Sequence, residues 1–522
     1  MGGVISSLAA AFKTGRTVIK ALGHLSAEYS ELLERACAAP PLPVRDPTTA
    51  YWQERPPFPE LVNICSEKLP ESADVVIVGS GITGVAIART ILHEDRRKGT
   101  SRRVVVCEAR TLCSGATGRN GGHIKASPFE VFGRFRKKLG PERAAALARF
   151  QLRHLETFVE LCKVERIDVA ECREVETVDL FLDDETYRTA LNEVDEVNKW
   201  VPEFTISRWT AEEAQMKFSA NRQVRGAISY KAGALWPYRL ITAIWKCLLA
   251  DFAETLSIET STAVDGILTE GSTDYPYVIS TSRGQIRAKH VVHATNGYAT
   301  RLIPGLQGKA IGLLVHMTSQ SPGVNFPDLN GRRSWSIMYS NGFDYITQRP
   351  SENGVPGKVM LGGGFFLSPK HGTDMMGAYD DSKVDSLTVA HNLGIMATVF
   401  EPNWGGPVDK EPNMVWSGVM GGSADLRPLV GKLDPQLTGR KVKGTQDCGE
   451  WISAYFTGDG MVWAWLCGTA LGIMITGGEE EDVPASPGRP GGKLGDWFPP
   501  ELLPTVKRVK AMDLADLAEE FS

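Results

Sequence analysis

One glycine-rich turn limits what this chain can fold into more than any other feature of its sequence. Residues 73–84 read ADVVIVGSGITG, an apolar run typical of a strand that ends in Gly79-x-Gly81-x-x-Gly84. A helical pattern follows the turn, and a second buried strand, VVVCE, is expected at residues 104–108. Strand, turn, helix and strand make a βαβ unit, which begins a doubly wound α/β fold with a parallel sheet.

The spacing within this turn suits a bound dinucleotide. Gly79 permits the tight turn, Gly81 carries no side chain to block a pyrophosphate, and Gly84 lets the helix pack close to the sheet. The first N–H groups of the helix are unpaired and favour phosphate. Glu108, at the end of the second strand, is placed to accept hydrogen bonds from the adenosine ribose, and its charge disfavours NADP. The predicted cradle consists of Gly79, Gly81, Ile82, Thr83, Gly84 and Glu108.

A second glycine-rich segment, RTLCSGATGRNGGH at residues 110–123, follows the acid and suits a chain that passes beneath a second phosphate and a flavin. It resembles the SGATGRNGG segment of the FAD-dependent D-amino-acid/glycine/sarcosine oxidase family, and within it the gamma-glutamylputrescine oxidoreductase-like branch. Three later segments are similar to that family in order: GALWP at 233–237, VVHATNGY at 291–298 and YFTGDGM at 455–461. The resemblance runs from about residue 73 to residue 477.

The resemblance implies a Rossmann-like FAD-binding domain interleaved with a substrate domain that contains a mixed or antiparallel sheet. The segments of the FAD-binding domain are expected at residues 73–125, 230–300 and 416–478. The segments of the substrate domain are expected at residues 126–229 and 305–415, with a long helical region at about 140–200. An N-terminal amphipathic helix with a proline-rich arm, and a C-terminal tail, are expected to flank the two domains at residues 1–72 and 479–522.

The last matching segment has a physical interpretation of its own. Gly458 and Gly460 would bring backbone close to a flat ring, and a helix is expected to begin near Met461 with its positive end toward that ring. Reduced flavin carries negative charge there, so this helix end would stabilise it. The other cofactor-binding residues that the resemblance implies are Ala109, Arg110, Ser114, Gly115, Arg119, Asn120, Gly121, Gly122, Val264, Ala294, Thr295 and Asn296.

The sequence departs from the family in three respects. The histidine of the last segment is replaced by Asp459. Relatives that hold flavin covalently use a cysteine that falls near Gly418 or a histidine that falls near Arg119, so non-covalent FAD is expected here. The lysine with which some relatives activate oxygen has no clear match, because Lys358 is offset, and this leaves oxidase and dehydrogenase activity both open.

The activity implied by the resemblance is oxidation of a C–N bond in an amine or amino acid, by hydride transfer to flavin N5, with O2 as the expected acceptor. The flavin carries the difficult step, so no catalytic triad is expected. Strand alternation puts Tyr345 and Arg349 on one face, where Arg349 is a candidate clamp for a carboxylate. The candidate catalytic residues are His123, Tyr345, Arg349, Asp425 and Asp459.

Three alternatives stay open at this point. A flavin monooxygenase also begins with this turn, but its later Gly-Asp segment carries a proline five residues after the Asp, and Asp459 has none. Another flavoenzyme that dehydrogenates a C–H bond, or a flavin-binding protein without catalysis, fits the same cofactor motifs. The colour of the purified protein, and its bleaching by amines, discriminates among them.

The composition of the chain limits the classes of partner that it is expected to bind. The net charge of −5 gives no basic field for nucleic acid, and no apolar run is long enough to span a bilayer. Nine cysteines without a CxxC pair predict a reduced, cytoplasmic protein with no metal site. Gly2 fits the minimal N-myristoylation pattern, and the basic amphipathic stretch at residues 4–33 offers residues 1–35 as a peripheral membrane contact. Packing of this helix on its own protein is the favoured interpretation.

Overall fold

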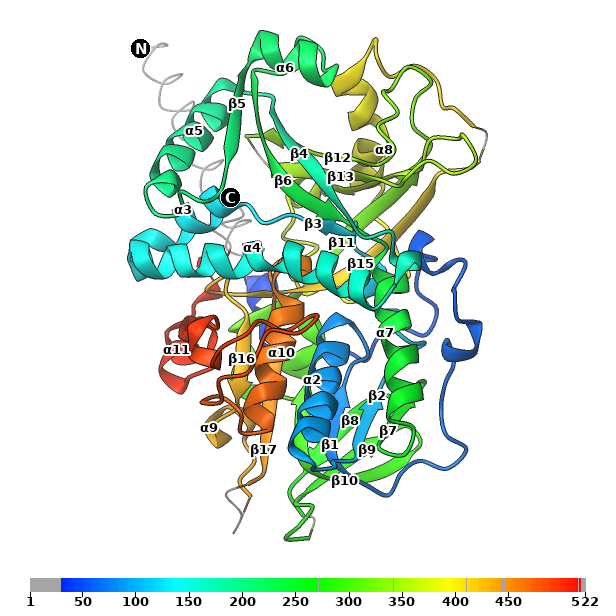
Figure 1. Cartoon of the computed structure of the whole chain (residues 1–522), viewed down its shortest axis with the longest axis vertical. Helices are drawn as coiled ribbons and strands as arrows, with labels where there is room; N and C mark the ends of the chain where they lie inside the picture. The colour runs from blue at the N-terminus through cyan, green and yellow to red at the C-terminus, as the bar shows by residue number, and fades with distance from the viewer. Residues whose placement is uncertain are drawn as a thin grey trace, which may run out of the picture.

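The structure, a computed structural model, describes residues 30–270, 272–340, 342–409, 411–442, 447–514 and 516–517. It has one sheet in each half of the molecule, and a long helix crosses between the halves (Figure 1). The expected α/β fold, with a parallel sheet and a second mixed sheet, is confirmed. The helices are α2 (Ile82–Lys98), α3 (Pro128–Leu139), α4 (Pro141–Val164), α5 (Asp184–Asn198), α6 (Ala211–Phe218), α7 (Pro237–Asp251), α8 (Ser386–Phe400), α9 (Pro435–Thr438), α10 (Ala464–Ile475) and α11 (Val506–Ala511).

The first sheet is built around a parallel core of five strands in the order β17-β10-β1-β2-β7. Strand β16 pairs antiparallel with β17 at one edge, and a β8–β9 hairpin extends from β10. The strands are β1 (Ser72–Val78), β2 (Val104–Cys107), β7 (Leu256–Glu259), β8 (Val264–Leu268), β9 (Tyr277–Thr281), β10 (Gly284–His293), β16 (Leu429–Lys432) and β17 (Gly449–Ala454).

Burial on both faces explains why β1 is a continuous apolar run. Val75 and Ile77 belong to the main apolar core with helices α2 and α10, while Val76 packs on the opposite side with the β8–β9 hairpin. Strands of parallel sheets are covered on both faces and therefore do not alternate between polar and apolar residues. Helices α2 and α10 approach closely, because Gly468 and Gly472 of α10 face α2.

The second sheet is mixed, in the order β15-β11-β14-β13-β12-β4-β6-β3, with β5 paired to β6. Most pairs are antiparallel, and β12 runs parallel to β4. The strands are β3 (His123–Ile124), β4 (Arg173–Phe181), β5 (Ile206–Thr210), β6 (Gly226–Ala234), β11 (Ala310–Gln320), β12 (Arg333–Tyr339), β13 (Gly342–Gln348), β14 (Val359–Gly363) and β15 (Met414–Ser423).

Two details differ from the boundaries expected from the sequence. The expected domain limits at residues 230 and 416 fall inside β6 and β15, and both strands belong to the second sheet. The expectation of a long helical region at 140–200 was wrong in its middle, where β4 lies between α4 and α5. The segment REVETVDLF is a strand because it pairs with β6 on one side and β12 on the other.

The two faces of the second sheet differ in chemistry. The outer face is apolar and packs against α6 and α8. The inner face, toward the first sheet, carries buried polar side chains on the central strands β4, β12 and β13. These side chains are Thr177, Asp179, Ser334, Ser336 and Thr347. A sheet that alternates in this way places a polar wall opposite the glycine-rich turn.

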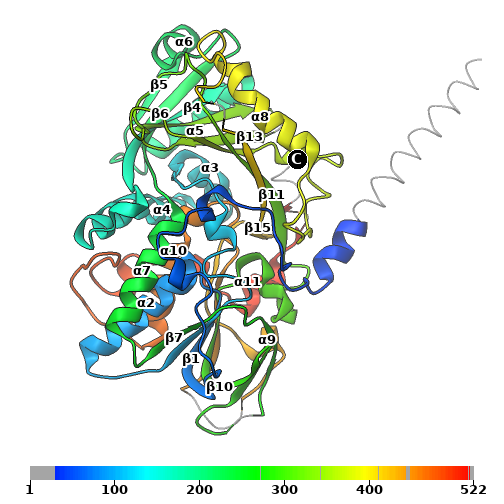
Figure 2. The same cartoon turned by 90° about the vertical axis from the view of Figure 1, so that its right-hand side faces the viewer.

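The N-terminal arm is part of the fold. Residues 38–72 run from a helix at 30–37 across the middle of the molecule to β1 (Figure 2). Trp52 is 2% exposed; its indole N–H donates to the carbonyl of Asn120, and its carbonyl accepts from the Trp236 indole at 2.8 Å. The arm therefore ties the loop after β2 to the start of α7.

The first residues of the chain bear on the expected membrane contact. Within the described part of the chain, no helix is both long and apolar enough to cross a membrane. Gly2 and residues 4–29 lie outside the described residues. In the helix at 30–37, Leu32 and Ala36 are buried, and the Arg35 guanidinium donates to the Met376 and Thr373 carbonyls, so this part packs on its own protein.

Replacement of Trp52 by alanine should destabilise the protein strongly. The change removes a large buried ring and leaves a cavity beside Trp236, a loss of about 3–5 kcal/mol for substitutions of this kind. Thermal unfolding followed by circular dichroism should give a clearly lower midpoint for Trp52→Ala. Met216→Ala, at a side chain 79% exposed, should unfold at the wild-type temperature. Equal midpoints for Trp52→Ala and wild type would contradict the packing of the arm.

Candidate active site

The glycine-rich turn has the geometry of a phosphate cradle. Gly79 has φ +112°, and an added Cβ there would lie 2.6 Å from the Ala294 carbonyl oxygen. A Cβ on Gly81 would lie 2.8 Å from the Thr117 hydroxyl, which accepts from the first helical N–H, that of Ile82, at 3.0 Å. Helix α2 starts directly after Gly81, so its N-terminus faces the open space above the turn.

One cavity covers this turn and reaches both sheets. The predicted cofactor residues that line it are Gly79, Gly81, Ile82, Thr83, Glu108, Ala109, Arg110, Gly115, Arg119, Asn120, Val264, Ala294, Thr295, Asn296, Gly458, Gly460 and Met461. Four other predicted residues, Gly84, Ser114, Gly121 and Gly122, support the lining residues instead of lining the cavity themselves. Gly84, for example, packs on Gly79, whose carbonyl an added side chain would overlap.

Glu108 is held at the end of β2 with its carboxylate beside the turn. It accepts from the Ser80 hydroxyl at 2.7 Å, from the Ser80 N–H at 3.2 Å and from the Arg110 N–H at 3.1 Å. These bonds fix the carboxylate at the cavity wall. Its position matches the acid that accepts hydrogen bonds from an adenosine ribose in dinucleotide folds.

The polar groups of the cavity fit a dinucleotide with a flat ring. The hydroxyl of Thr295, which lines the cavity, is buried and has no partner within the described chain, as expected of a group that binds a ligand. At the other end, an added Cβ on Gly460 would meet no atom within 4 Å, so backbone is open to a ring there. The helix expected at Met461 begins at Ala464, after a 3₁₀ turn (η8) at Gly460–Val462.

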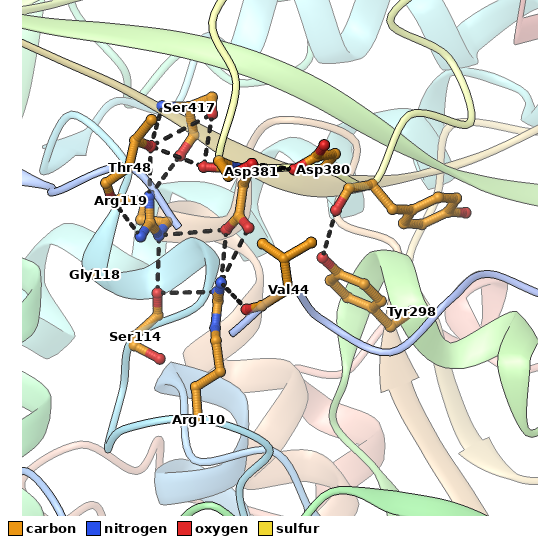
Figure 3. Close-up of polar contacts among 12 residues, drawn as sticks. Val44, Thr48, Arg110, Ser114, Gly118, Arg119, Tyr298, Asp380, Asp381 and Ser417 are labelled. Atoms are coloured by element: carbon orange, nitrogen blue, oxygen red, sulfur yellow. Dashed lines mark hydrogen bonds and ion pairs between the residues drawn. The ribbon is translucent and has the colours of Figure 1, made fainter. Parts of the chain in front are cut away.

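A buried carboxylate joins the arm to the cavity (Figure 3). Asp381 accepts from Arg110 at 3.0 Å and lies 3.6 Å from the Arg119 guanidinium. Arg119 also donates to the carbonyls of Thr48 and Ser417, both at 2.7 Å. Burial lowers the pKa of Arg119 to about 10, and Asp381 opposes that shift. Leu42 and Pro43, which precede Thr48 in the arm, line the cavity.

The two positions that carry the flavin link in some relatives converge at this place. Gly418 and Arg119 both line the cavity, and a Cβ on Gly418 would lie 3.2 Å from the Arg119 Cβ. Neither a backbone glycine nor an arginine with this set of hydrogen bonds offers a nucleophile.

One of the candidate catalytic residues, Tyr345, lines the cavity, whereas His123 does not. The His123 ring lies 6.4 Å from the Tyr345 ring, at 21° between the planes. His123 Nε2 is 2.9 Å from the Ser334 hydroxyl, and burial, followed by the charge of Lys125, keeps the pKa of His123 well below its usual value. Burial raises the pKa of Tyr345 to about 12. Both rings are therefore neutral near pH 7.

Asp459 lies in the turn between Gly458 and Gly460. Burial raises the pKa of its carboxyl, against the charges of Arg134 and Lys125 and a hydrogen bond from the Gln151 side chain. The family's histidine is thus replaced by an acid at the edge of the cavity.

Arg349 and Asp425 do not join this set. Arg349 donates to Glu171 at 2.7 Å and to the Tyr51 hydroxyl at 2.7 Å. Asp425 is held by Arg427 at 2.6 Å and by Arg508 at 2.8 Å. Neither residue lines the cavity, because each is held in an ion pair elsewhere. Strand alternation placed Arg349 correctly on the face of Tyr345, but the ion pair with Glu171 turns it aside.

Sequence reasoning missed several residues of the cavity. The arm residues had no local signal, because they lie far from the turn in sequence. Thr117 lies inside the SGATGRNGG segment, which was recognised from the sequence. Its hydroxyl accepts from the first N–H of α2, and its place in that segment could have identified it as a cavity residue. The missed lining residues are Leu42, Pro43, Val78, Ser80, Cys107, Ala116, Thr117, Tyr298, Arg301, Leu302, Val315, Met317, Val419, Met420, Phe456 and Ala464.

A βαβ turn, a ribose-side acid and a cavity between two sheets define a two-domain flavoprotein of the doubly wound class. Over residues 74–472 the sequence matches the family model described as FAD dependent oxidoreductase (DAO), and the chain belongs to this family. It is an FAD-dependent oxidoreductase, which confirms the predicted cofactor and enzyme class. A search of curated protein sequences gives no match.

Solved structures share the fold at low identity. Glycine oxidase from Geobacillus kaustophilus is 19% identical, with a TM-score of 0.57 over 79% of this chain and 96% of that chain. L-proline dehydrogenase from P. horikoshii is 20% identical, with a TM-score of 0.59 over 85% and 100%. L-amino acid deaminase from Proteus vulgaris is 18% identical, with a TM-score of 0.56 over 82% and 95%. At such identities the similarity establishes the fold.

Replacement of Gly81 by valine should abolish FAD binding. The new Cβ would press on the Thr117 hydroxyl and its methyl groups would occupy the space over the turn. Gly81→Val should purify colourless, as measured by the ratio of flavin to protein absorbance. Gly394→Ala, on the exposed side of α8 with no atom near the new Cβ, is the matched control and should keep full flavin content. A yellow Gly81→Val protein would show that the cradle lies elsewhere.

Proposed function

We propose that this protein oxidises a C–N bond of a small amine or amino acid and passes the electrons to O2. The observation that carries the proposal is the wall of the cofactor cavity, where apolar Val315 and Met317 stand beside neutral Tyr345. The neutral His123 ring lies 6.4 Å from the ring of Tyr345. Such a wall excludes water from the reacting groups. Within the family, the GRNGG segment supports placement in the gamma-glutamylputrescine oxidoreductase-like branch.

The chain's own residues orient and protect the substrate in this proposal. FAD, when bound, supplies the acceptor for a hydride. His123 is fixed by Ser334 and stays neutral, so it offers one hydrogen bond without charge. Tyr345 keeps its proton, and its hydroxyl contacts the Met317 sulfur at 3.0 Å, which holds the ring in place. Rigid neutral groups of this kind favour one orientation of the reacting C–H bond.

The electron acceptor is the finer part of the proposal. Lys358, the nearest lysine in sequence to the one that activates oxygen in relatives, donates to Ser321 at 2.7 Å and to Asp409 at 3.1 Å. It does not line the cavity. We nevertheless place O2 as acceptor, since the reduced enzyme needs no further partner for that reaction. Hydrogen peroxide formed in step with substrate loss supports an oxidase, and turnover with a dye alone favours a dehydrogenase.

The central experiment is anaerobic bleaching of the yellow holoenzyme by a panel of amines, amino acids and alcohols. Bleaching by amines or amino acids alone supports the proposal. Bleaching by alcohols, or only by NAD(P)H as in flavin monooxygenases, contradicts it. No bleaching by any compound would favour a flavin-binding protein without this activity.

FAD should be held without a covalent link. Gly418 and Arg119 stand where relatives carry the linking cysteine or histidine, and neither side chain can form the bond. Acid precipitation of the protein should therefore leave all the yellow colour in the supernatant. Colour in the protein pellet would contradict this expectation.

Flavin reduction by an amine should speed up as pH rises through the pKa of the bound amine, because only the neutral amine releases hydride readily. An anionic Asp459 near the amine favours the ammonium form and raises that pKa. Asp459→Asn should therefore shift the rate–pH profile to lower pH while FAD stays bound. Stopped-flow bleaching across pH measures this, with Asp265→Asn on the exposed side of β8 as the control. A rate independent of pH would contradict an amine substrate.

A further inference from the structure

A lysine that the proposed mechanism does not use lies beside the substrate wall. Lys125 follows β3, and its ammonium donates to the Asp179 carboxylate at 2.7 Å and to the Ser336 hydroxyl at 2.8 Å. Asp179 also accepts from the Tyr230 hydroxyl at 2.8 Å. An ammonium group has three donors, and two of the three are accounted for by these contacts.

The charged side chains of Lys125 and Asp179 differ in their exposure. The Asp179 side chain is fully buried beneath Lys125, whereas the Lys125 side chain keeps 13% of its surface exposed. Burial alone would lower the pKa of Lys125, but the carboxylates of Asp179 and Glu130 raise it. Lys125 therefore stays charged and is the member of the pair that a ligand can reach.

The pair lies next to the cofactor cavity. Ser336 is directly opposite Tyr345 in the β12–β13 register, and Tyr345 lines the cavity. His123, two residues before Lys125, contacts Ser334 on the same face of the sheet. The hydroxyl of Thr177, on the neighbouring strand of that face, is fully buried and has no partner within the described chain. The polar wall thus has donors that the protein itself leaves unused.

Burial also acts on the neighbouring carboxyls. It raises the pKa of Glu130 to about 7, helped by Asp179 and Asp459 and opposed by Lys125 and Arg134. Burial raises the pKa of Asp459 as well. Lys125 therefore has neighbouring carboxyls whose ionisation is disfavoured by burial.

The other cations near the cavity are already engaged. Arg119 is held by Asp381 and three carbonyl oxygens, and Arg110 is held by Asp381. Arg301 donates to the Pro40 carbonyl in the arm and keeps a buried Nε–H without a partner in the described chain, and Arg349 is paired with Glu171. Lys125 is the cation with a spare donor that lies on the inner face of the second sheet, beside Ser336 and Asp179.

We propose that Lys125 binds the carboxylate of the substrate, with Asp179 as a positioning residue that holds the ammonium against β12. This inference rests on the proposed function and narrows it: the substrate is an amino acid, or an amine that carries a carboxylate, and not a simple amine. A charged hydrogen bond in a partly buried site contributes enough to discriminate such a substrate from its uncharged analogue.

The test measures ligand binding without turnover. The flavin spectrum of the yellow holoenzyme is titrated with propionate and with propionamide, which match in size and differ in charge. Wild type should bind propionate more tightly than propionamide. Lys125→Met should weaken propionate by about 10- to 100-fold and leave propionamide unchanged. Lys231→Met, at an exposed lysine paired with Glu174 on β6, is the control and should behave as wild type.

A second variant guards against a purely structural effect. Lys125→Met alone leaves Asp179 buried without its partner, so Lys125→Met/Asp179→Asn removes both charges together. It should retain FAD and show the same selective loss of propionate binding. Equal binding of the two probes by wild type, or equal losses of both probes in the variants, overturns the assignment.

The outcome is separable from that of the proposed function. If amino acids and amines bleach the flavin but Lys125 variants keep their preference for propionate, the assignment of Lys125 fails alone. If no amine or amino acid bleaches the flavin, the proposed function fails, and the probe titration still reports whether Lys125 binds a carboxylate. Turnover adds a further measure, because Lys125→Met should raise KM for amino acids and not for the corresponding uncharged amines.

Discussion

The carboxylate of Asp381 holds together parts of the chain that lie far apart in sequence. It sits 1% exposed between the guanidinium groups of Arg110 and Arg119, which come from the loop after β2. Its backbone bonds to Thr48 of the arm and to Ser417 of β15. Buried charges of this kind are costly to leave unpaired, so each member constrains the others. The shape of the cavity between the two sheets depends on this contact.

Side chains along the strands of the second sheet alternate between its two faces. One face contributes to structural stability, and the other contributes to chemical selectivity. Outward side chains such as Ile337 and Ile346 pack under α6 and α8 and carry no chemistry. Inward side chains on β4, β12 and β13 include hydroxyls and the carboxylate of Asp179, and they face the cofactor side. A polar face can be buried at acceptable cost only if its groups are hydrogen-bonded to one another or to a ligand. The ion pair of Lys125 with Asp179 and the contact of His123 with Ser334 meet that condition in part.

The sequence predicted the first βαβ unit and most of the cofactor cavity because those signals are local. The residues that form the turn from Gly79 to Gly84 are close together in sequence. Their spacing therefore indicates the function of the turn without knowledge of the rest of the fold. The strand β4 could not be predicted, because its partners lie far away in sequence and its charged residues resemble a helix surface. The place of Lys125 beside the cavity could not be predicted either, because a lysine is normally exposed. Arg349 was placed on the correct face, but the ion pair with Glu171 that decides its role comes from another element.

The path of the arm determines the order in which the molecule can be completed. Residues 42–48 leave the ribosome before everything they touch, and Asp381 and Ser417 follow more than three hundred residues later. Contacts between such distant segments form late, because the whole intervening chain must first be ordered. Until then the side of the cavity lined by Leu42 and Pro43 stays uncovered. The arm therefore closes this side of the cavity only when Asp381 and Ser417 are in place to receive it.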